Sequence, residues 1–223
     1  MPNWCFQNLT VYGRSKEDVK PFLDAIKNKN NEDDEDDEYK QYSLNQLVPR
    51  PKCLENSVSG WFGDGEEAKA HAEQSAKNLA ECGWANWYDW ANDNWGTKWG
   101  ACDVDFCDEF PVHDGYLANL RFTSAWSPAI PLIAKISSQF PNLMFSVSFT
   151  EESDAFAGVD VFVNGVSQAS FEVEPDISNL PPYSEENAEE YYDALLYKRN
   201  EMFILLDDNE TAFMKSAKEA MPQ

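Results

Sequence analysis

The stretch WGACDVDFCDEFPVHDGYLANLRFT, residues 99–123, indicates two β-strands joined by a short turn. Apolar and polar side chains alternate from Trp99 to Phe110, and a second alternation begins at Gly115 and runs to Thr123. A period of two places successive side chains on opposite faces of a strand, whereas a helix requires a period near 3.6. We therefore expect two neighbouring strands, each with one apolar face. These faces carry Cys102, Val104, Phe106, Tyr116, Ala118, Leu120 and Phe122.

On either side of this pair, runs of β-branched and aromatic or alternating residues predict further strands, and apolar residues at helical spacing predict two helices. In chain order, a strand at 3–13 and a helix from Ser15 to about Asn28 precede the two strands above. A helix from Ser127-Pro128 to about Phe140 and a strand at 143–149 follow them. Two last strands, at 156–163 and 166–173, flank Asn164-Gly165. The Asn-Gly pair is a strong hairpin signal. The order βαββαβ predicts an α+β fold, a ferredoxin-like antiparallel sheet with an added hairpin. The helices would cover one face, and the other would stay open unless an insertion covers it.

Two segments do not fit this plan. We predict a ferredoxin-like domain at 1–175 with a long helical insertion at about 30–93, and an acidic helical extension at 176–223. Within the insertion, residues 64–82 have helical spacing. In the extension, Ser184 is a plausible helix cap, and a second helical piece is expected after Asp207-Asp208-Asn209.

The charge of the chain is strongly negative and concentrated. Its 223 residues include 40 acidic and 17 basic side chains, a net charge of −23. Residues 30–42 hold 7 acids and one Lys (−6), and residues 172–223 hold 13 acids and 4 bases (−9), so together they account for −15. A protein that binds nucleic acid directly needs Lys and Arg to neutralise phosphates, so we do not expect direct nucleic-acid binding.

The five cysteines, Cys5, Cys53, Cys82, Cys102 and Cys107, are an odd number with irregular spacing. With no recognisable export signal and no apolar run long enough to span a membrane, we interpret them as reduced thiols in a cytoplasmic protein. Cys102, Cys107 and His113 could be drawn as a zinc site. In a regular strand, however, positions 102 and 107 point to opposite faces. We therefore expect no metal.

The sequence contains no motif that specifies a reaction. There are two histidines, His71 and His113, and no nucleophile elbow, phosphate-binding loop, dinucleotide fingerprint or His-Glu-x-x-His zinc motif. We therefore expect a protein that is not an enzyme and needs no cofactor.

Three short segments carry a resemblance to a known family. They are Trp4-Cys5 with Asn8 and Leu9, the hexapeptide Asn94-Trp95-Gly96-Thr97-Lys98-Trp99, and Phe122 with Trp126-Ser127-Pro128. Over roughly residues 1–165 the chain resembles the YubB-type ferredoxin-like domain family, the phage Api-like proteins of bacteriophages and conjugative plasmids. The resemblance implies the fold and a mobile-element origin. That family has no established catalytic set, so it implies no active-site residues, and the acidic block and the C-terminal extension lie outside its pattern.

One candidate site surrounds the hexapeptide. A Lys held between Trp rings forms a cation–π clamp, and an Arg opposite two carboxylates could hold a small polar ligand. The alternative is structural: the Trp rings fill the core, the glycines allow a tight turn, and the Arg neutralises one Asp. The candidate ligand-binding residues are Trp95, Lys98, Trp99, Asp103, Asp105 and Arg121.

A second candidate site is the acidic surface itself. Carboxylates fixed on a folded body can imitate the phosphates of DNA and occupy a basic groove. On a helix, positions 186, 189, 190 and 193 share one face. The alternative is a solubilising surface with a flexible acidic loop. The candidate partner-binding residues are Glu32, Asp33, Asp34, Glu35, Asp36, Asp37, Glu38, Glu186, Glu189, Glu190 and Asp193.

These observations favour an accessory protein of a phage or plasmid that acts by binding. The expected partner is a host nucleic-acid-handling or defence protein with a basic surface, inhibited by acidic surfaces that mimic DNA. One alternative is a binder of a small molecule or nucleotide signal at the Trp/Lys98/Arg121 face. Another is a structural interaction module, with the C-terminal helix packed on a partner or on a second copy as a homodimer.

Overall fold

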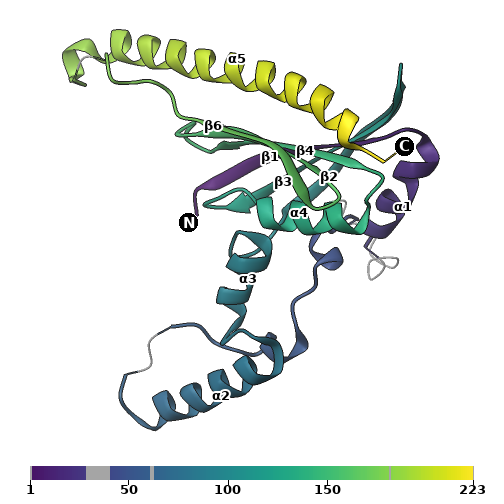
Figure 1. Ribbon diagram of the computed structural model, residues 1–223. Helices are drawn as coiled ribbons and strands as arrows, with labels where there is room; N and C mark the ends of the chain where they lie inside the picture. The colour runs from purple at the N-terminus through teal and green to yellow at the C-terminus, as the bar shows by residue number, and fades with distance from the viewer. Residues whose placement is uncertain (1, 29–40, 61–62, 181, 223) are drawn as a thin grey trace.

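A six-stranded antiparallel sheet forms the centre of the protein (Figure 1). The computed structural model describes residues 2–28, 41–60, 63–180 and 182–222. The strands are β1 (Trp4–Gly13), β2 (Cys102–Val112), β3 (Gly115–Ala125), β4 (Met144–Glu151), β5 (Ala157–Val163) and β6 (Val166–Val173). The helices are α1 (Lys16–Ile26), α2 (Glu66–Cys82), α3 (Trp87–Trp95), α4 (Ile130–Gln139) and α5 (Ala188–Ala220), with short 3-10 turns η2 (Asn45–Leu47), η3 (Lys52–Leu54) and η4 (Glu185–Asn187).

The strand order β2-β3-β1-β4-β5-β6 confirms the predicted α+β fold. In its first four strands, β1 lies between β3 and β4, with α1 and α4 in the two crossover connections, which is the ferredoxin-like arrangement. The hairpin β5–β6 extends the sheet beyond β4. Its turn residues Asn164 and Gly165 both have positive φ, as a type I′ turn requires.

The main core lies between the sheet and the helices α1 and α4. Leu9 and Val11 project from β1 to this side, because alternate residues of a strand point to the same face. Phe22 of α1 and Ile133 of α4 are fully buried against the same face, together with Phe145 of β4. The helical spacing of Phe22 and Ile133 and the alternation around Phe145 therefore predicted side chains that lie in this core.

The opposite face of the sheet is half covered, and by the C-terminal helix rather than by the insertion. Met202 and Leu206 of α5 are buried against Val159 and Val161 of β5. Figure 1 shows α5 crossing the strands on the side opposite α4, with its N-terminal end extending past them. The expected break after Asp207-Asp208-Asn209 is wrong, because α5 is one continuous helix of 33 residues. Its packing is mainly on β4, β5 and β6.

Polar contacts fasten α5 to the sheet at both ends. The Arg199 guanidinium donates to the carbonyl oxygen of Ser153 at 2.6 Å and lies 3.6 Å from Asp154. Near the C-terminus, Lys218 pairs with Asp114 at 2.9 Å, and its ammonium lies 4.2 Å from the centre of the Tyr12 ring. Between these ends the helix is held by apolar side chains and by one glutamate.

That glutamate, Glu210, is expected to make the protein less stable as the pH rises. Ser146 donates to its carboxylate at 2.9 Å, but burial raises the pKa of Glu210 above its ordinary value. The unfolded chain loses this proton near the ordinary pKa of about 4.3, whereas the folded chain keeps it to a higher pH. Between these two pKa values the free energy of unfolding therefore falls as the pH rises. Glu210→Gln should remove this decline in a urea-unfolding pH series, whereas Glu219→Gln, exposed on the same helix, should keep it.

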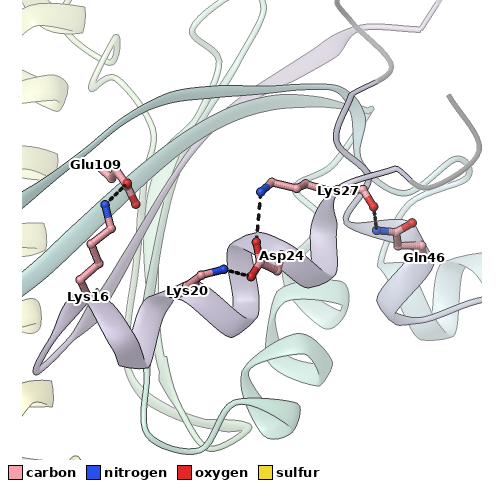
Figure 2. Close-up of polar contacts among 6 residues, drawn as sticks. All are labelled: Lys16, Lys20, Asp24, Lys27, Gln46 and Glu109. Carbon is pink, nitrogen blue, oxygen red and sulfur yellow. Dashed lines mark hydrogen bonds and ion pairs between the residues drawn. The ribbon is translucent and has the colours of Figure 1, made fainter. Parts of the chain in front are cut away.

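Ion pairs and hydrogen bonds hold α1 against β2 and η2 (Figure 2). Lys16 pairs with Glu109 at 2.6 Å, and Asp24 accepts hydrogen bonds from Lys20 and from Lys27. The Gln46 amide donates to the carbonyl oxygens of residues 25 and 27 at the end of the helix. The residues that flank the acidic segment are also joined, since the backbone N–H of residue 28 donates to the carbonyl of residue 41 at 2.8 Å.

The edge strand β2 departs from the regular alternation expected for it. Its pairing with β3 shifts register between Cys102 and Asp105 and again between Phe106 and Asp108. Such bulges insert an extra residue and bend an edge strand. The backbone of Asp103 has φ of +50° within the first irregularity. We expected a regular pairing of β2 with β3 for the candidate site residues, and the two register shifts show that this expectation is wrong. Asp105 nevertheless lies opposite Arg121.

Candidate functional site

The N-terminal end of α5 and the preceding η4 turn present a cluster of exposed carboxylates. Glu186 lies in η4, and Glu189, Glu190 and Asp193 lie in the first two turns of α5, all exposed and lining one shallow hollow with Asn187. Spacings of three and four residues place Glu189, Glu190 and Asp193 on one side of α5, and Glu186 lines the same hollow from η4 rather than from the expected helix. We refer to Glu186, Glu189, Glu190 and Asp193 as the α5 acidic cluster.

Three tyrosine rings lie beside this cluster. Tyr183, Tyr191 and Tyr192 contact one another edge to face, with ring centres 5.5 to 5.9 Å apart. Tyr183 is 53% exposed and Tyr192 is 57% exposed. Tyr is enriched among the residues that dominate binding energies at protein interfaces. From the sequence, Tyr191 and Tyr192 were expected only as part of an apolar helix stripe and Tyr183 was not singled out; the exposure of these rings becomes apparent from how far α5 projects beyond the sheet.

The negative charge of this region is not neutralised by neighbouring cations on the same helix. Between residues 182 and 214 the basic residues are Lys198 and Arg199. Lys198 pairs with Glu201 at 2.9 Å, and Arg199 binds Ser153 and Asp154 at the sheet. The acidic cluster therefore faces solvent with its charge available to an external partner. The other acidic candidates, residues 32–38, lie outside the described residues.

A second cluster surrounds Lys98 at the connection between α3 and β2. The Lys98 ammonium lies 5.1 Å from the ring centre of Trp99, 5.7 Å from that of Trp126 and 5.8 Å from that of Trp87. These are cation–π distances. Trp126 is 49% exposed and has a backbone φ of +67°, which is unusual for a bulky residue. Lys98 was expected between Trp95 and Trp99, and of these two only Trp99 contacts it. The other two rings, Trp87 and Trp126, come from outside the hexapeptide.

Trp95 does not belong to this clamp. It is almost completely buried, packs edge to face on Trp90 at 4.9 Å, and donates its indole N–H to the carbonyl of Val48 at 2.9 Å. The cation stacked on its ring is Arg50, at 5.4 Å, which also stacks on Trp87 at 5.2 Å. Burial lowers the pKa of Arg50 below its ordinary value. The structural alternative holds for Trp95, and Arg50 carried no signal in the sequence.

The turn residues of the hexapeptide are also explained by packing. Gly96 caps α3 with φ of +78°, and an added side chain there would overlap the ring of Pro131. Thr97 is buried and donates its hydroxyl to the carbonyl of Ala125 at 2.7 Å. Gly100 has φ of +70° and lies against Asn45. These residues join α3 to β2, β3 and α4.

Arg121 lies on the half of the sheet that α5 leaves open. Its guanidinium lies 3.5 Å from Asp105 and donates to the sulfur of Cys107 at 3.1 Å. Thr123 donates to Asp103 at 3.3 Å. Exposed pairs of this kind contribute roughly 0–1 kcal/mol to stability. The structure thus brings Arg121, Asp105 and Asp103 onto neighbouring positions, with Arg121 already neutralised by Asp105.

The same open face contains a pocket of about 350 Å³ beside Arg121. Thr10 donates to the side-chain oxygen of Asn119 at 3.0 Å, and Asn119 donates to Asp108 at 2.8 Å. Asn8 completes its polar lining from β1. These residues were not predicted as site candidates from the sequence. The available signal was the alternation along β1, which places Asn8 and Thr10 on the sheet face opposite the core residues Leu9 and Val11.

The residues described contain no arrangement of three or more His, Cys, Asp or Glu side chains that could hold a metal ion. The two cysteines of the proposed zinc set differ in environment: Cys107 is exposed beside Arg121, whereas burial raises the pKa of Cys102 to about 11. Across the described helices, none is both long enough and apolar enough to cross a membrane.

The strands β2 to β6, with α4 and the first turns of α5, match a known family model. Residues 102–195 match a family model described as a ferredoxin-like domain in Api92-like protein. A solved structure, the crystal structure of a protein Api92 from Yersinia pseudotuberculosis, is similar at 11% sequence identity and a TM-score of 0.45, covering 78% of this chain and 98% of that one. Among curated proteins, no match was found.

The Api92-like match supports the expected resemblance at the level of a ferredoxin-like domain. It begins at the first residue of β2 and ends within α5, so Arg121 and the α5 acidic cluster lie inside it. The strand β1, the helical insertion and the acidic block at 32–38 lie outside it. The resemblance had been expected over roughly residues 1–165, so the matched range is shifted toward the C-terminus.

Proposed function

We propose that this protein is a non-enzymatic accessory protein of a phage or plasmid that binds and inhibits a host nucleic-acid-handling or defence protein. The observation that carries the proposal is the α5 acidic cluster, exposed beside the tyrosine rings and unpaired with the cations of its own helix. The resemblance to phage and plasmid proteins supports the mobile-element origin.

The contact would be formed between carboxylates of α5 and a basic groove that otherwise binds DNA or RNA. A fixed array of carboxylates complements the positive potential of such a groove as a phosphate backbone does. Tyr183 and Tyr192 add apolar area at the same place and can stack on Arg side chains of the partner. Association of this kind is fast and weakens steeply with added salt.

The test is capture of host proteins on the immobilised full chain, with elution by a salt gradient and competition by double-stranded DNA. We expect a basic nucleic-acid-binding protein that DNA displaces. A variant with Glu186→Gln, Glu189→Gln, Glu190→Gln and Asp193→Asn should lose at least tenfold in affinity for it, because each close charge pair at an interface contributes roughly 1.5 kcal/mol or more.

A matched control removes the same number of charges elsewhere. Glu66, Glu67, Glu73 and Glu81 are exposed on α2, and replacing all four by Gln gives the same net charge as the α5 variant. If binding depended on total charge alone, both variants would weaken equally. Equal binding by the two variants, or a captured protein that DNA does not displace, would contradict the proposal.

The pocket beside Arg121 favours a second candidate function, the binding of a small polar ligand on the open sheet face. Asn8, Asn119 and Arg121 offer both donors and acceptors around a volume that suits a small molecule. Thermal stabilisation by members of a nucleotide and metabolite panel, lost in Arg121→Ala but kept in the α5 variant, would favour this function over protein binding.

A further inference from the structure

Two of the five cysteines lie in contact although they are far apart in the sequence. The sulfur of Cys53, in η3, is 2.9 Å from the sulfur of Cys82, the last residue of α2. Both side chains are half-buried, so a small molecule in solution can reach them. The other three cysteines have no sulfur neighbour recorded among the described residues.

The backbone on each side fixes this pair in position. Pro51 begins the η3 turn, in which the N–H of Leu54 donates to the carbonyl of Pro51 at 2.9 Å, and the Leu54 side chain is fully buried. At the other side, Gly83 caps α2 in a left-handed conformation directly after Cys82. The Cys82 thiol also lies 3.3 Å from the carbonyl of Asn78. The two sulfurs, 2.9 Å apart, need to approach by only about 1 Å to reach the length of an S–S bond.

The pair lies where α2 joins the rest of the protein. Asn78 is the one residue of α2 that is fully buried, and its amide donates to the carbonyl of Ala85 at 2.9 Å. The remaining side chains of α2 are mostly exposed, and the element that it packs against is η3. A covalent link between Cys53 and Cys82 would fasten α2 at this contact.

We propose that Cys53 and Cys82 are a redox modification site, a thiol pair that a low-molecular-weight disulfide such as oxidised glutathione converts into a reversible disulfide. One cysteine, as its thiolate, attacks the glutathione disulfide, forms a mixed disulfide and releases one glutathione thiolate. The second cysteine, after losing its proton, attacks the protein sulfur of the mixed disulfide and releases the second glutathione. Two protein thiols are oxidised and one glutathione disulfide is reduced to two thiols, so the electrons balance.

The Cys53 thiol exchanges slowly at neutral pH. The hydrogen bond to Cys82 and burial raise the pKa of the Cys53 thiol to about 11, so the reactive thiolate is scarce at neutral pH. Once formed, the bond closes the chain between residues 53 and 82. A closed loop has fewer unfolded conformations, so α2 should open less often.

The first test is the thiol state of the full chain after equilibration with oxidised glutathione. We expect the intact mass to fall by about 2 Da, the two hydrogens lost on disulfide formation. Peptide mapping should show Cys53 linked to Cys82, while Cys5, Cys102 and Cys107 remain available to alkylation. Cys53→Ser and Cys82→Ser should each abolish the mass loss, and Cys102→Ser should keep it. Five free thiols, a stable glutathione adduct on either cysteine, or a link between other cysteines would overturn the proposal.

A second measurement covers the case in which a serine variant folds differently. Trypsin can cleave α2 after Lys69 and Lys77, both of which are exposed. Oxidation of the unmodified chain should slow these cleavages several-fold, and a reductant should restore the original rate. Cleavage at the same rate in the oxidised and reduced chain would show that the bond does not fasten α2.

Discussion

Phe22→Ala is expected to lower the free energy of unfolding by about 3–5 kcal/mol, the usual cost of removing a buried Phe. Phe22 is fully buried on α1 and meets the rings of Phe140 and Phe145 edge to face, with centres 5.5 and 5.3 Å away. It thus connects α1, the end of α4 and β4. Removal of the ring would leave a cavity whose walls belong to three different elements and cannot easily close.

The measurement is urea unfolding followed by circular dichroism, with Phe6→Ala as the matched control. Phe6 is also an aromatic residue of the sheet domain, but it is 51% exposed on the open face. We expect this control to lose less than about 1 kcal/mol. A similar loss in both variants would show that the core does not lie on the α1 side of the sheet as described.

The residues that decide this core could be predicted from the sequence because their signals are local. β-Branched and aromatic composition predicted β1, alternation along β4 placed Phe145 on an apolar face, and the Asn164-Gly165 pair predicted the hairpin turn. Such signals need only the geometry of one strand or one turn. They suffice for the ferredoxin-like order of elements.

The course of α5 was predicted less well, because a local signal conflicted with packing. Asp207-Asp208-Asn209 has the composition of a helix cap, yet Met202 and Leu206 before it and Ala217 after it are all buried on one side of a single helix. Burial of this stripe against β5 outweighs the weak preference of Asp and Asn for helix ends. The apolar stripe of α5 could be recognised in the sequence, but its contact with β5 could not.

The candidate sites depend on long-range contacts and were predicted only in part. Lys98 was expected between Trp95 and Trp99, but Trp95 lies in the core. Trp87 and Trp126 approach Lys98 only in the folded chain. Asp105 lies opposite Arg121 as expected, whereas the bulges of β2 could not be inferred from alternation. For the acidic cluster, the spacing correctly predicted a shared helix face for Glu189, Glu190 and Asp193, whereas Glu186 lies in η4 before the helix. The structure adds the projection of α5 beyond the sheet (Figure 1).

The last prediction compares two glycines that end helices in the same way. Gly96 caps α3 with φ of +78°, and Gly83 caps α2 with φ of +87°; each donates its N–H to a carbonyl in the last turn of its helix. An added Cβ at position 83 would meet no atom within 4 Å, whereas at position 96 it would overlap the ring of Pro131. The two sites therefore share the conformational cost of a side chain and differ in the steric cost.

Gly83→Ala should lower the free energy of unfolding by about 1–2 kcal/mol, the cost of the left-handed conformation. Gly96→Ala should lose a further 1–3 kcal/mol or so, because the new methyl group must displace α4 at Pro131. Adding Pro131→Ala to Gly96→Ala should recover much of that further loss, although Pro131→Ala alone should not stabilise the protein. A double-mutant cycle measures this coupling directly. Equal losses at the two glycines, or no coupling to Pro131, would mean that the connection between α3 and β2 does not rest on α4.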